Sequence, residues 1–202
     1  MKEINEEKLI KAAQKGDVGA FEKLISQYEK KIYALCLHLL KDPEEAYDAA
    51  QEVCIKIWRQ LESFEGQAKF STWLYRIGTN QCLDLMRKNK KRSKDISLFQ
   101  KDEESEEEWI LQGPHEKEGG AEAVEKKALQ EVIQLGIGEL KEDYQVIITL
   151  RDIEEHSYEE IAEVLDLSLG TVKSRLARAR QSLKKVLVQN KEPYRSFFRH
   201  IK

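Results

Sequence analysis

The sequence has 202 residues, of which 35% are charged and 41% are hydrophobic, and its formal net charge is -3. Its length suits one ordinary domain or two small ones, of which two are favoured. Its helix-forming residues, with only three prolines, predict a soluble, helix-rich protein with few strands. The polar, acidic start is unlike a signal peptide and no apolar run approaches the roughly 20 residues that span a bilayer, so we expect a cytoplasmic protein without membrane insertion.

Charge is segregated along the chain. Residues 86–101 contain seven basic residues and one acidic residue, residues 102–108 are almost all acidic, and residues 172–202 contain ten basic residues and one acidic residue. This pattern indicates two polyanion-binding surfaces separated by an acidic segment. Solvated helix faces and an unrelated charged loop are the alternative.

Apolar periodicity and capping residues predict the helices of the first half. Gly16 and Asp17 are expected to end one helix and to cap the next. From Phe21 to Leu39 apolar residues recur at steps of three and four, which predicts one helix packed on a core. A further helix is expected to start at residues 42–45, where an aspartate, a proline and a glutamate form a capping-box-like pattern.

This further helix has an apolar face and a mixed face. The expected buried stripe is Ala46, Ala50, Val53, Ile57 and Leu61. The opposite face carries Asp48, Gln51, Ile55 and Arg59, with Glu52 and Trp58 at its flanks. An isoleucine in a polar face beside a tryptophan is a sign of a partner surface, although single exposed apolar residues are common.

The next segment mixes aromatic and basic residues. A loop around Gly66 and an N-cap at Ser71 or Thr72 are expected to precede a long helix. Such a mixture can stack on unpaired bases while it neutralises the phosphate backbone; it comprises Phe70, Trp73 and Tyr75 with Lys69, Arg76, Arg87 and Lys88. Asn80 and Asp84 share a helical edge with Arg76, Arg87 and Lys88, but Asp84 can equally pair with Arg87 or Lys88. Trp73 is as consistent with a core position.

The remaining features of the chain argue against other kinds of functional site. Cys36, Cys54 and Cys82 are expected to be free buried thiols, without a zinc site or a disulfide framework. The acidic, glycine-containing stretch after residue 101 is typical of a mobile linker. No nucleophile has an adjacent base in sequence, so no catalytic residue is predicted.

The segment 157–183 has the pattern of a helix-turn-helix. Ser157 and Glu160 form a capping box, and residues 166–168 suit a short turn. In the second helix an inward face is expected for Val172, Leu176, Ala179 and Leu183, and an outward face for Thr171, Ser174 and Arg178, with Lys173 and Ala177 beside them. The outward face can enter a DNA major groove, whereas Arg175 and Arg180 suit phosphate contact or internal pairing. An ordinary amphipathic hairpin is the alternative.

Two parts of the sequence resemble bacterial sigma factors of the extracytoplasmic-function (ECF) group of the sigma-70 family. The promoter minus-thirty-five recognition region of that group is similar to SYEEIAEVLDLSLGTVKSRLARARQSL. Its other conserved domain is similar to DPEEAYDAAQEVCIKIW followed by FEGQAKFSTWLYRIGTNQCLDLMRK. The resemblance implies an all-α fold with a region 2-like bundle (1–96), a flexible acidic linker (97–121), a region 4-like helix-turn-helix domain (122–191) and a basic aromatic tail (192–202).

The resemblance also implies three sets of binding residues. The set expected to bind core RNA polymerase, at its clamp helices, is Asp48, Gln51, Glu52, Ile55 and Arg59. The set expected to bind and melt the minus-ten element, with a loop that captures an extruded base, is Glu65, Gly66, Gln67, Ala68, Lys69, Phe70, Ser71, Trp73, Arg76, Asn80, Arg87 and Lys88. The set expected to read the minus-thirty-five element is Ser168, Gly170, Thr171, Lys173, Ser174, Arg175 and Arg178.

Four residues depart from the usual pattern of the group. Tyr47 stands where an acid is usual and Cys54 where an aromatic is usual, which changes details of the polymerase-binding face. Lys141 stands where proline is typical, and Gln145 where arginine is frequent, so a contact made by that arginine is expected to be absent.

The function implied is that of a promoter-specificity subunit of RNA polymerase, with no cofactor, no metal and no enzymatic activity. Its expected partners are core RNA polymerase, promoter DNA and an anti-sigma factor. A helix-turn-helix repressor or activator that never engages polymerase is the second interpretation. A helical nuclease or recombinase is the third.

Overall fold

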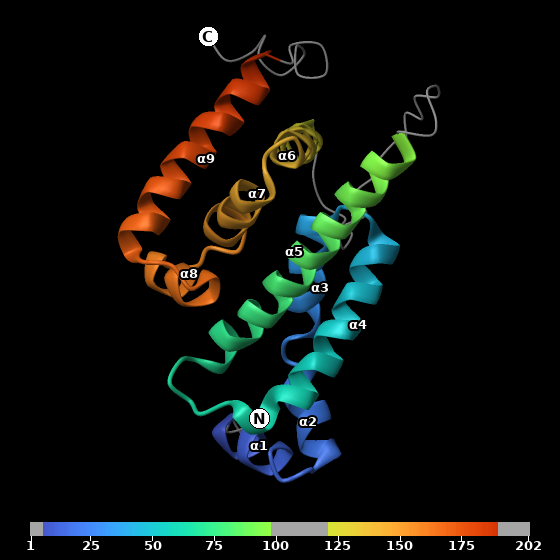
Figure 1. Cartoon of the computed structure of the whole chain (residues 1–202), viewed down its shortest axis with the longest axis vertical. Coiled ribbons are helices and arrows are strands. Elements are labelled where there is room, and N and C mark those ends of the chain that lie inside the picture. The colour runs from blue at the N-terminus through green and yellow to red at the C-terminus, as the bar shows by residue number, and fades with distance from the viewer. Residues whose placement is uncertain (1–5, 98–120, 190–202) are drawn as a thin grey trace.

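The chain folds into two helical units that lie side by side (Figure 1). The structure is a computed structural model that describes residues 6–97 and 121–189, and these residues form helices and no strand. The first unit contains α1 (Glu6–Ala13), α2 (Val18–Ile25), α3 (Glu29–Leu40), α4 (Pro43–Gln60), a short 3-10 turn (Leu61–Ser63) and α5 (Phe70–Ser97). The second contains α6 (Ala121–Gly138), α7 (Glu142–Ile148), a π-helical turn (Thr149–Ile153), α8 (Tyr158–Leu165) and α9 (Leu169–Gln189).

Most of the expected linker and the whole basic aromatic tail lie outside the described residues. None of the helices in the described part of the chain is both long enough and apolar enough to cross a membrane.

Side-chain caps start the helices of the first unit where the sequence predicts them. Asp17 accepts a hydrogen bond from the Ala20 N–H at 3.0 Å and caps α2. Asp42 accepts one from the Glu45 N–H at 2.7 Å, ahead of a proline in the first turn of α4. The predicted N-cap at Ser71 or Thr72 is wrong, because α5 begins at Phe70 and both residues lie in its first turn.

The single helix predicted from Phe21 to Leu39 is divided into α2 and α3. The Gln27 and Tyr28 N–H groups bond to carbonyls three residues back, which forms a tight turn between the two helices. This turn returns the apolar stripe to the same side, since Leu24 before it and Ile32 after it are both fully buried. Periodicity alone therefore cannot detect the break.

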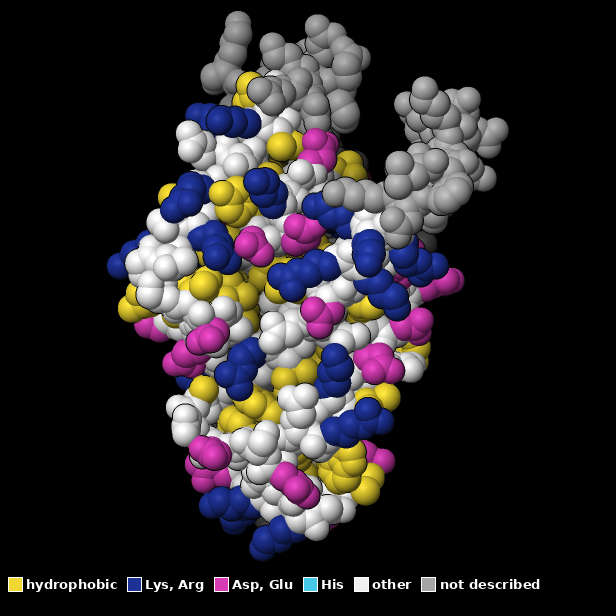
Figure 2. All heavy atoms as spheres, viewed as in Figure 1, with side chains coloured by type: hydrophobic (Ala, Val, Ile, Leu, Met, Phe, Trp, Pro, Cys, Tyr) yellow, Lys and Arg dark blue, Asp and Glu magenta, His cyan; other side chains and the backbone are white. Residues whose placement is uncertain are grey.

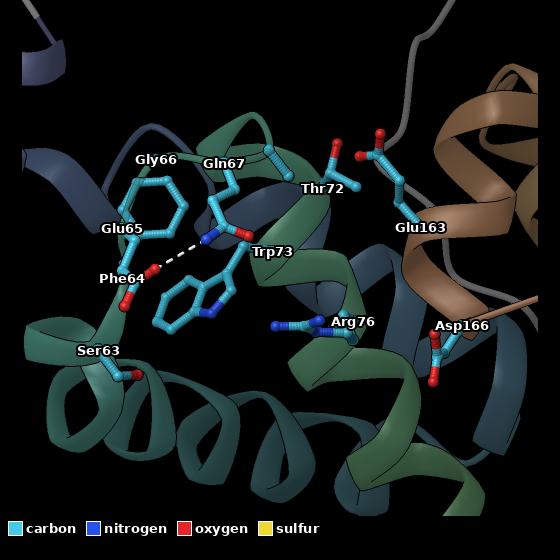
Figure 3. Close-up of a pocket in the computed structure, with 11 residues that line it drawn as sticks. Ser63, Phe64, Glu65, Gly66, Gln67, Thr72, Trp73, Arg76, Glu163 and Asp166 are labelled. Atoms are coloured by element: carbon cyan, nitrogen blue, oxygen red, sulfur yellow. Dashed lines mark hydrogen bonds between the residues drawn. The ribbon is translucent and has the colours of Figure 1, made fainter.

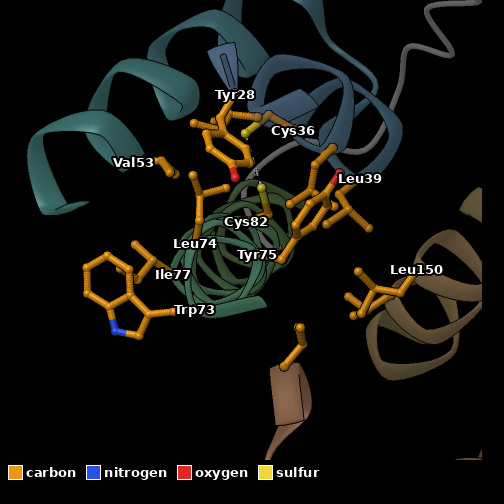
Figure 4. Packing of buried hydrophobic residues seen from close by; sticks show 14 of the residues in the cluster. Tyr28, Cys36, Leu39, Val53, Trp73, Leu74, Tyr75, Ile77, Cys82 and Leu150 are labelled. Carbon is orange, nitrogen blue, oxygen red and sulfur yellow. Dashed lines mark hydrogen bonds between the residues drawn. The ribbon is translucent and has the colours of Figure 1, made fainter. Parts of the chain in front are cut away.

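The core of the first unit forms where α3, α4 and α5 pack together (Figure 4). Its largest fully buried side chains are Leu24, Ile32, Leu35, Ile57, Leu61 and Leu74. On α4 the predicted stripe is buried except at Ala50, which is half-buried, and Ala49 is buried as well. The thiols of Cys36 and Cys82 lie 3.6 Å apart in this core, and all three cysteines are free.

The second unit contains the predicted helix-turn-helix. Ser157 and Glu160 form both hydrogen bonds of a capping box at the start of α8. Asp166 ends α8 in a left-handed conformation with φ 52°, and the Ser168 side chain then accepts the Thr171 N–H at 3.2 Å, at the start of α9. Val172, Leu176 and Ala179 are buried and Leu183 is partly buried, so α9 directs the predicted face inward.

Gln145 has a structural role in the second unit. Its Nε2 donates to the carbonyls of Gly138 and Leu140 at 2.9 and 2.8 Å. The side chain is buried and binds the carbonyl groups that the end of α6 leaves without helical partners. Glutamine at this position therefore fixes the turn from α6 to α7.

We expect Ser157→Ala to destabilise the second unit by about 1 kcal/mol, because it removes the cap of α8. Urea denaturation, followed together with hydrogen exchange of the α8 amides, measures this. Ser174→Ala is the matched control, since Ser174 lies inside α9 and alanine is the better helix former. Equal loss of stability in both variants would contradict the capping role.

Candidate nucleic-acid interface

The mixed face of α4 is exposed. Asp48, Gln51, Glu52 and Arg59 all lie on the surface, and Ile55 is 42% exposed. Next to them Tyr47 is 59% exposed, so α4 presents two large apolar side chains among charges. The predicted polymerase-binding set omits Tyr47, although the sequence already shows a tyrosine at a position where the group usually has an acid. This face can bind a protein partner that offers both apolar area and charge.

The loop between α4 and α5 is held by Gln14, the residue that follows α1. Gln14 Nε2 donates to the carbonyls of Leu61 and Phe64 at 3.1 and 2.9 Å. Gly66 has φ +74°, a left-handed conformation that other residues rarely adopt, and it turns the loop. Gln67 Nε2 then donates to Glu65 Oε2 at 2.8 Å (Figure 3). Sequence reasoning missed Gln14, because its partners lie 47 and 50 residues away.

The aromatic residues at the start of α5 lie in the core. Phe70 is 2% exposed and Trp73 is 7% exposed. The ring centroid of Phe64 lies 5.4 Å from that of Phe70 and 5.2 Å from that of Trp73, and the ring centroid of Tyr28 lies 5.5 Å from that of Phe70. A base that stacks on Phe70 or Trp73 has to enter this cluster, so their predicted DNA contact stays a prediction.

The other members of the minus-ten set form a polar surface around the loop and along α5. Exposed side chains are Gln67, Lys69, Arg76, Asn80, Arg87 and Lys88, with Glu65 and Gly66 also exposed and Ala68 and Ser71 half-buried. The Asp84 carboxylate lies 3.9 Å from Arg87, as the internal-pairing alternative predicts. Figure 2 shows Lys and Arg side chains gathered in the upper part of the view, where α5 and α9 run, with acids between them.

A pocket of about 380 Å³ lies beside the loop and includes residues of both units (Figure 3). The first unit contributes the loop residues 63–68 with Thr72, Trp73 and Arg76. The second unit contributes Glu163 and Asp166 from α8 and its C-cap. The acids of α8 therefore face the surface that is predicted to bind DNA.

The outward face of α9 also lies close to α5. Ser174 and Arg178 are exposed, Thr171 is half-buried, and all three line a pocket together with Arg87. An adjoining pocket brings Arg175 to Asn80 and Asp84. The rest of the predicted minus-thirty-five set, Ser168, Gly170 and Lys173, is exposed.

The two arginines expected to contact phosphate or to pair internally have acidic neighbours. Arg175 lies 3.6 Å from Asp143 of α7. Arg180 is paired with Asp152 of the π-helical turn, and this hydrogen bond raises the pKa of Arg180. Both arginines thus have intramolecular partners in this structure.

Acid is expected to weaken the contact that Glu160 makes between the units. Glu160 accepts from Lys69 Nζ at 2.9 Å and from the Ser157 N–H at 3.0 Å, and these hydrogen bonds lower the pKa of Glu160 to about 2. Because this pKa lies below the ordinary value, the stabilisation is fully present above about pH 5 and disappears as the pH falls toward about 2.

Thermal melting across this pH range tests the acid effect. Glu160→Gln keeps a residue that suits the capping box, so it should lose less stability on acidification than the wild type. An identical acid loss in both proteins would show that Glu160 does not contribute to it.

Comparison with known proteins identifies two matched regions. Residues 24–92 match the family model of sigma-70 region 2, and residues 130–183 match that of sigma-70, region 4. The RNA polymerase sigma-H factor of Pseudomonas aeruginosa is 35% identical over 185 residues, which cover 90% of this chain and 93% of that protein. The ECF RNA polymerase sigma factor SigW of Bacillus subtilis is 38% identical over 183 residues, which cover 89% of this chain and 95% of that protein.

Two solved structures share the fold. CnrH, in complex with the cytosolic domain of CnrY, gives a TM-score of 0.62 at 23% identity and covers 90% of this chain and 96% of that chain. The sigma factor RpoE of Bartonella quintana, in complex with the anti-sigma factor NepR, gives a TM-score of 0.60 at 24% identity. The match covers 84% of this chain and 98% of that chain.

Proposed function

The chain belongs to the ECF group of sigma-70 family RNA polymerase sigma factors, and we propose that its two helical units divide the work of promoter recognition between them. It acts in promoter-specific transcription initiation with RNA polymerase. In the proposed division, residues 1–96 bind core polymerase and the minus-ten element, and residues 122–191 bind the minus-thirty-five element. Residues 97–121 tether the two domains, and the tail 192–202 follows.

The polymerase-binding surface in this proposal is the mixed face of α4. It combines the exposed carboxylates of Asp48 and Glu52 with the exposed apolar side chains of Tyr47 and Ile55. Apolar anchors surrounded by polar groups are typical of protein interfaces. Core RNA polymerase is the partner that the family implies for this face.

The minus-ten surface is the loop around Gly66 with the polar edge of α5. Lys69, Arg76, Arg87 and Lys88 supply positive charge along a single-stranded backbone. Extruding a base costs a few kcal/mol, which stacking and polar contacts in the loop can offset without a chemical step. The protein therefore binds and melts the element and is not an enzyme.

The minus-thirty-five surface is the outward face of α9. Hydroxyl groups and an arginine such as Arg178 can hydrogen-bond to base edges in the major groove, and Gly170 allows close approach of the backbone. Since the protein acts with polymerase on the bacterial chromosome, we place it in the cytoplasm. Both solved structures that share the fold were determined in complexes, one of them with a named anti-sigma factor, and this supports an anti-sigma factor as a further partner.

The observation that carries this proposal is the presence of both matched regions, in order, on one chain. A helix-turn-helix repressor needs only the second region, so the first region with its exposed α4 face separates the two interpretations.

Reconstituted transcription tests the function. Core polymerase with the purified chain should initiate at discrete start sites on genomic DNA of the same organism, and core alone should not. A protein that shifts promoter DNA but leaves core inactive at every site would instead be a simple repressor or activator. Plasmid cleavage in the presence of magnesium would favour the nuclease.

A further inference from the structure

Lys141 stands at the start of α7, at a position where the sequence departs from the usual pattern of the group. Its backbone is extended, with φ -63° and ψ 147°, and it is the N-cap residue of α7. The side chain is exposed and makes no capping hydrogen bond. The ammonium group is therefore not bound to the start of its own helix.

The Lys141 side chain lies beside the outward face of α9. It lines a pocket of about 410 Å³ together with Thr171, Ser174 and Arg178, which are three of the residues proposed to read the minus-thirty-five element. Helix α7 packs against α9, and the two helices lie next to each other in Figure 1. This packing brings a cation from outside the helix-turn-helix to the edge of the reading face.

The charge of Lys141 is not neutralised by the acids that follow it in the sequence, because both acids have other partners. Glu142 bonds to Lys90 at 2.7 Å. Asp143 lies 3.6 Å from Arg175. Within the described part of the chain, the Lys141 side chain takes part in no hydrogen bond or ion pair. A cation that no carboxylate neutralises is available to an anion from outside the protein.

Gln145, the other unusual residue of this segment, cannot take the same role. It is only 7% exposed, and its side-chain amide is bound to the carbonyls of Gly138 and Leu140. Helix α7 itself contains no lysine or arginine. Lys141 is therefore the cation that the start of α7 offers to DNA.

The width of the DNA major groove decides what Lys141 can reach. The groove is about 12 Å wide and an α-helix with its side chains is about 10–12 Å in diameter, so a helix that reads bases fills the groove. A side chain beside the reading face then meets the phosphates that border the groove and not the base edges. Lysine suits this place, because its ammonium group binds phosphate as a point charge.

We propose that Lys141 binds a phosphate at the edge of the major groove when α9 reads the minus-thirty-five element. This inference rests on the proposed function and adds to it a DNA contact from outside the predicted set. A phosphate contact fixes the position of the protein on the duplex and adds affinity, but it carries no sequence information. The affinity that Lys141 supplies should therefore be the same for every sequence and should fall as the salt concentration rises.

The salt dependence of DNA binding by the holoenzyme tests the proposal. The probe is a duplex that carries the minus-thirty-five element of a mapped promoter and ends before the minus-ten element. Lys141→Gln should reduce the slope of log affinity against log salt concentration by about 0.9, which is a loss of about eightfold in affinity at about 0.1 M salt and about fourfold at about 0.2 M. Lys141→Arg should restore both, because it keeps the charge. An unchanged slope in Lys141→Gln would overturn the proposal.

Lys30→Gln is the matched control, since it removes the same charge from an exposed position on α3 of the first unit. Its slope should equal that of the wild type. On a second duplex with altered bases in the element, Lys141→Gln should show the same loss of affinity as on the first. A loss confined to the original element would mean that Lys141 reads bases, and it too would overturn the proposal.

Arg178→Ala, measured on the same duplexes, separates this inference from the proposed function. If Arg178→Ala weakens binding and Lys141→Gln does not, the phosphate contact is refuted and the reading helix stands. If neither variant changes binding, the assignment of α9 as the reading helix fails together with the inference.

Discussion

Gln51→Ala/Glu52→Ala is expected to weaken binding to core RNA polymerase about thirtyfold while the fold stays intact. Both side chains are exposed on the mixed face of α4, next to Ile55. Loss of polar groups at the centre of an interface costs about 2 kcal/mol, which corresponds to that change in affinity. Binding of labelled chain to core, followed by fluorescence anisotropy, measures the effect.

Gln60→Ala/Glu62→Ala is the matched control for this prediction. It removes the same two residue types from exposed positions just beyond the proposed set. Near-normal binding by the first variant, or equal loss in both, would mean that the α4 face is not the polymerase-binding surface.

Arg178→Ala is expected to reduce holoenzyme binding to the minus-thirty-five element by about tenfold to a hundredfold, because a bidentate contact between arginine and a base is worth about 1–3 kcal/mol. The assay uses holoenzyme, since in the free chain Arg178 lies beside α5. Association with core should be unchanged, because Arg178 belongs to α9 of the second unit and not to the α4 face. Gel shifts with promoter DNA and pull-downs with core measure the two properties on one variant.

Lys184→Ala controls for the loss of one positive charge from α9. Lys184 is exposed on the same helix but lies outside the proposed reading face. It should weaken binding to all DNA sequences slightly and to the same extent, as a phosphate contact does. Loss of core binding in Arg178→Ala would show that the helix has been misassigned.

Local features of this fold could be predicted from the sequence. Asp17, Asp42 and Ser157 cap helices where the sequence indicates, because a cap depends only on residues within one turn. The inward face of α9 follows from apolar spacing for the same reason. The family resemblance then supplied the partners, which local patterns do not contain.

The rest depends on contacts between distant segments. Burial of Phe70 depends on Tyr28, which precedes α3 and is distant in the sequence, and on Phe64 of the loop before α5. The contacts of Glu154 with Tyr75 and His38 join residues 79 and 116 positions apart, so no window of sequence reveals them. Charge segregation indicated two polyanion-binding surfaces, but it did not show that acids of α8 face one of them.

Permanganate reactivity on a promoter mapped by transcription tests the division of labour most directly. Holoenzyme formed from core and this chain should make thymines in the minus-ten element reactive while the duplex at the minus-thirty-five element stays paired and protected from nuclease. Neither core nor the free chain alone should do so. Protection at both elements without any reactive thymine, or opening by core alone, would contradict the account.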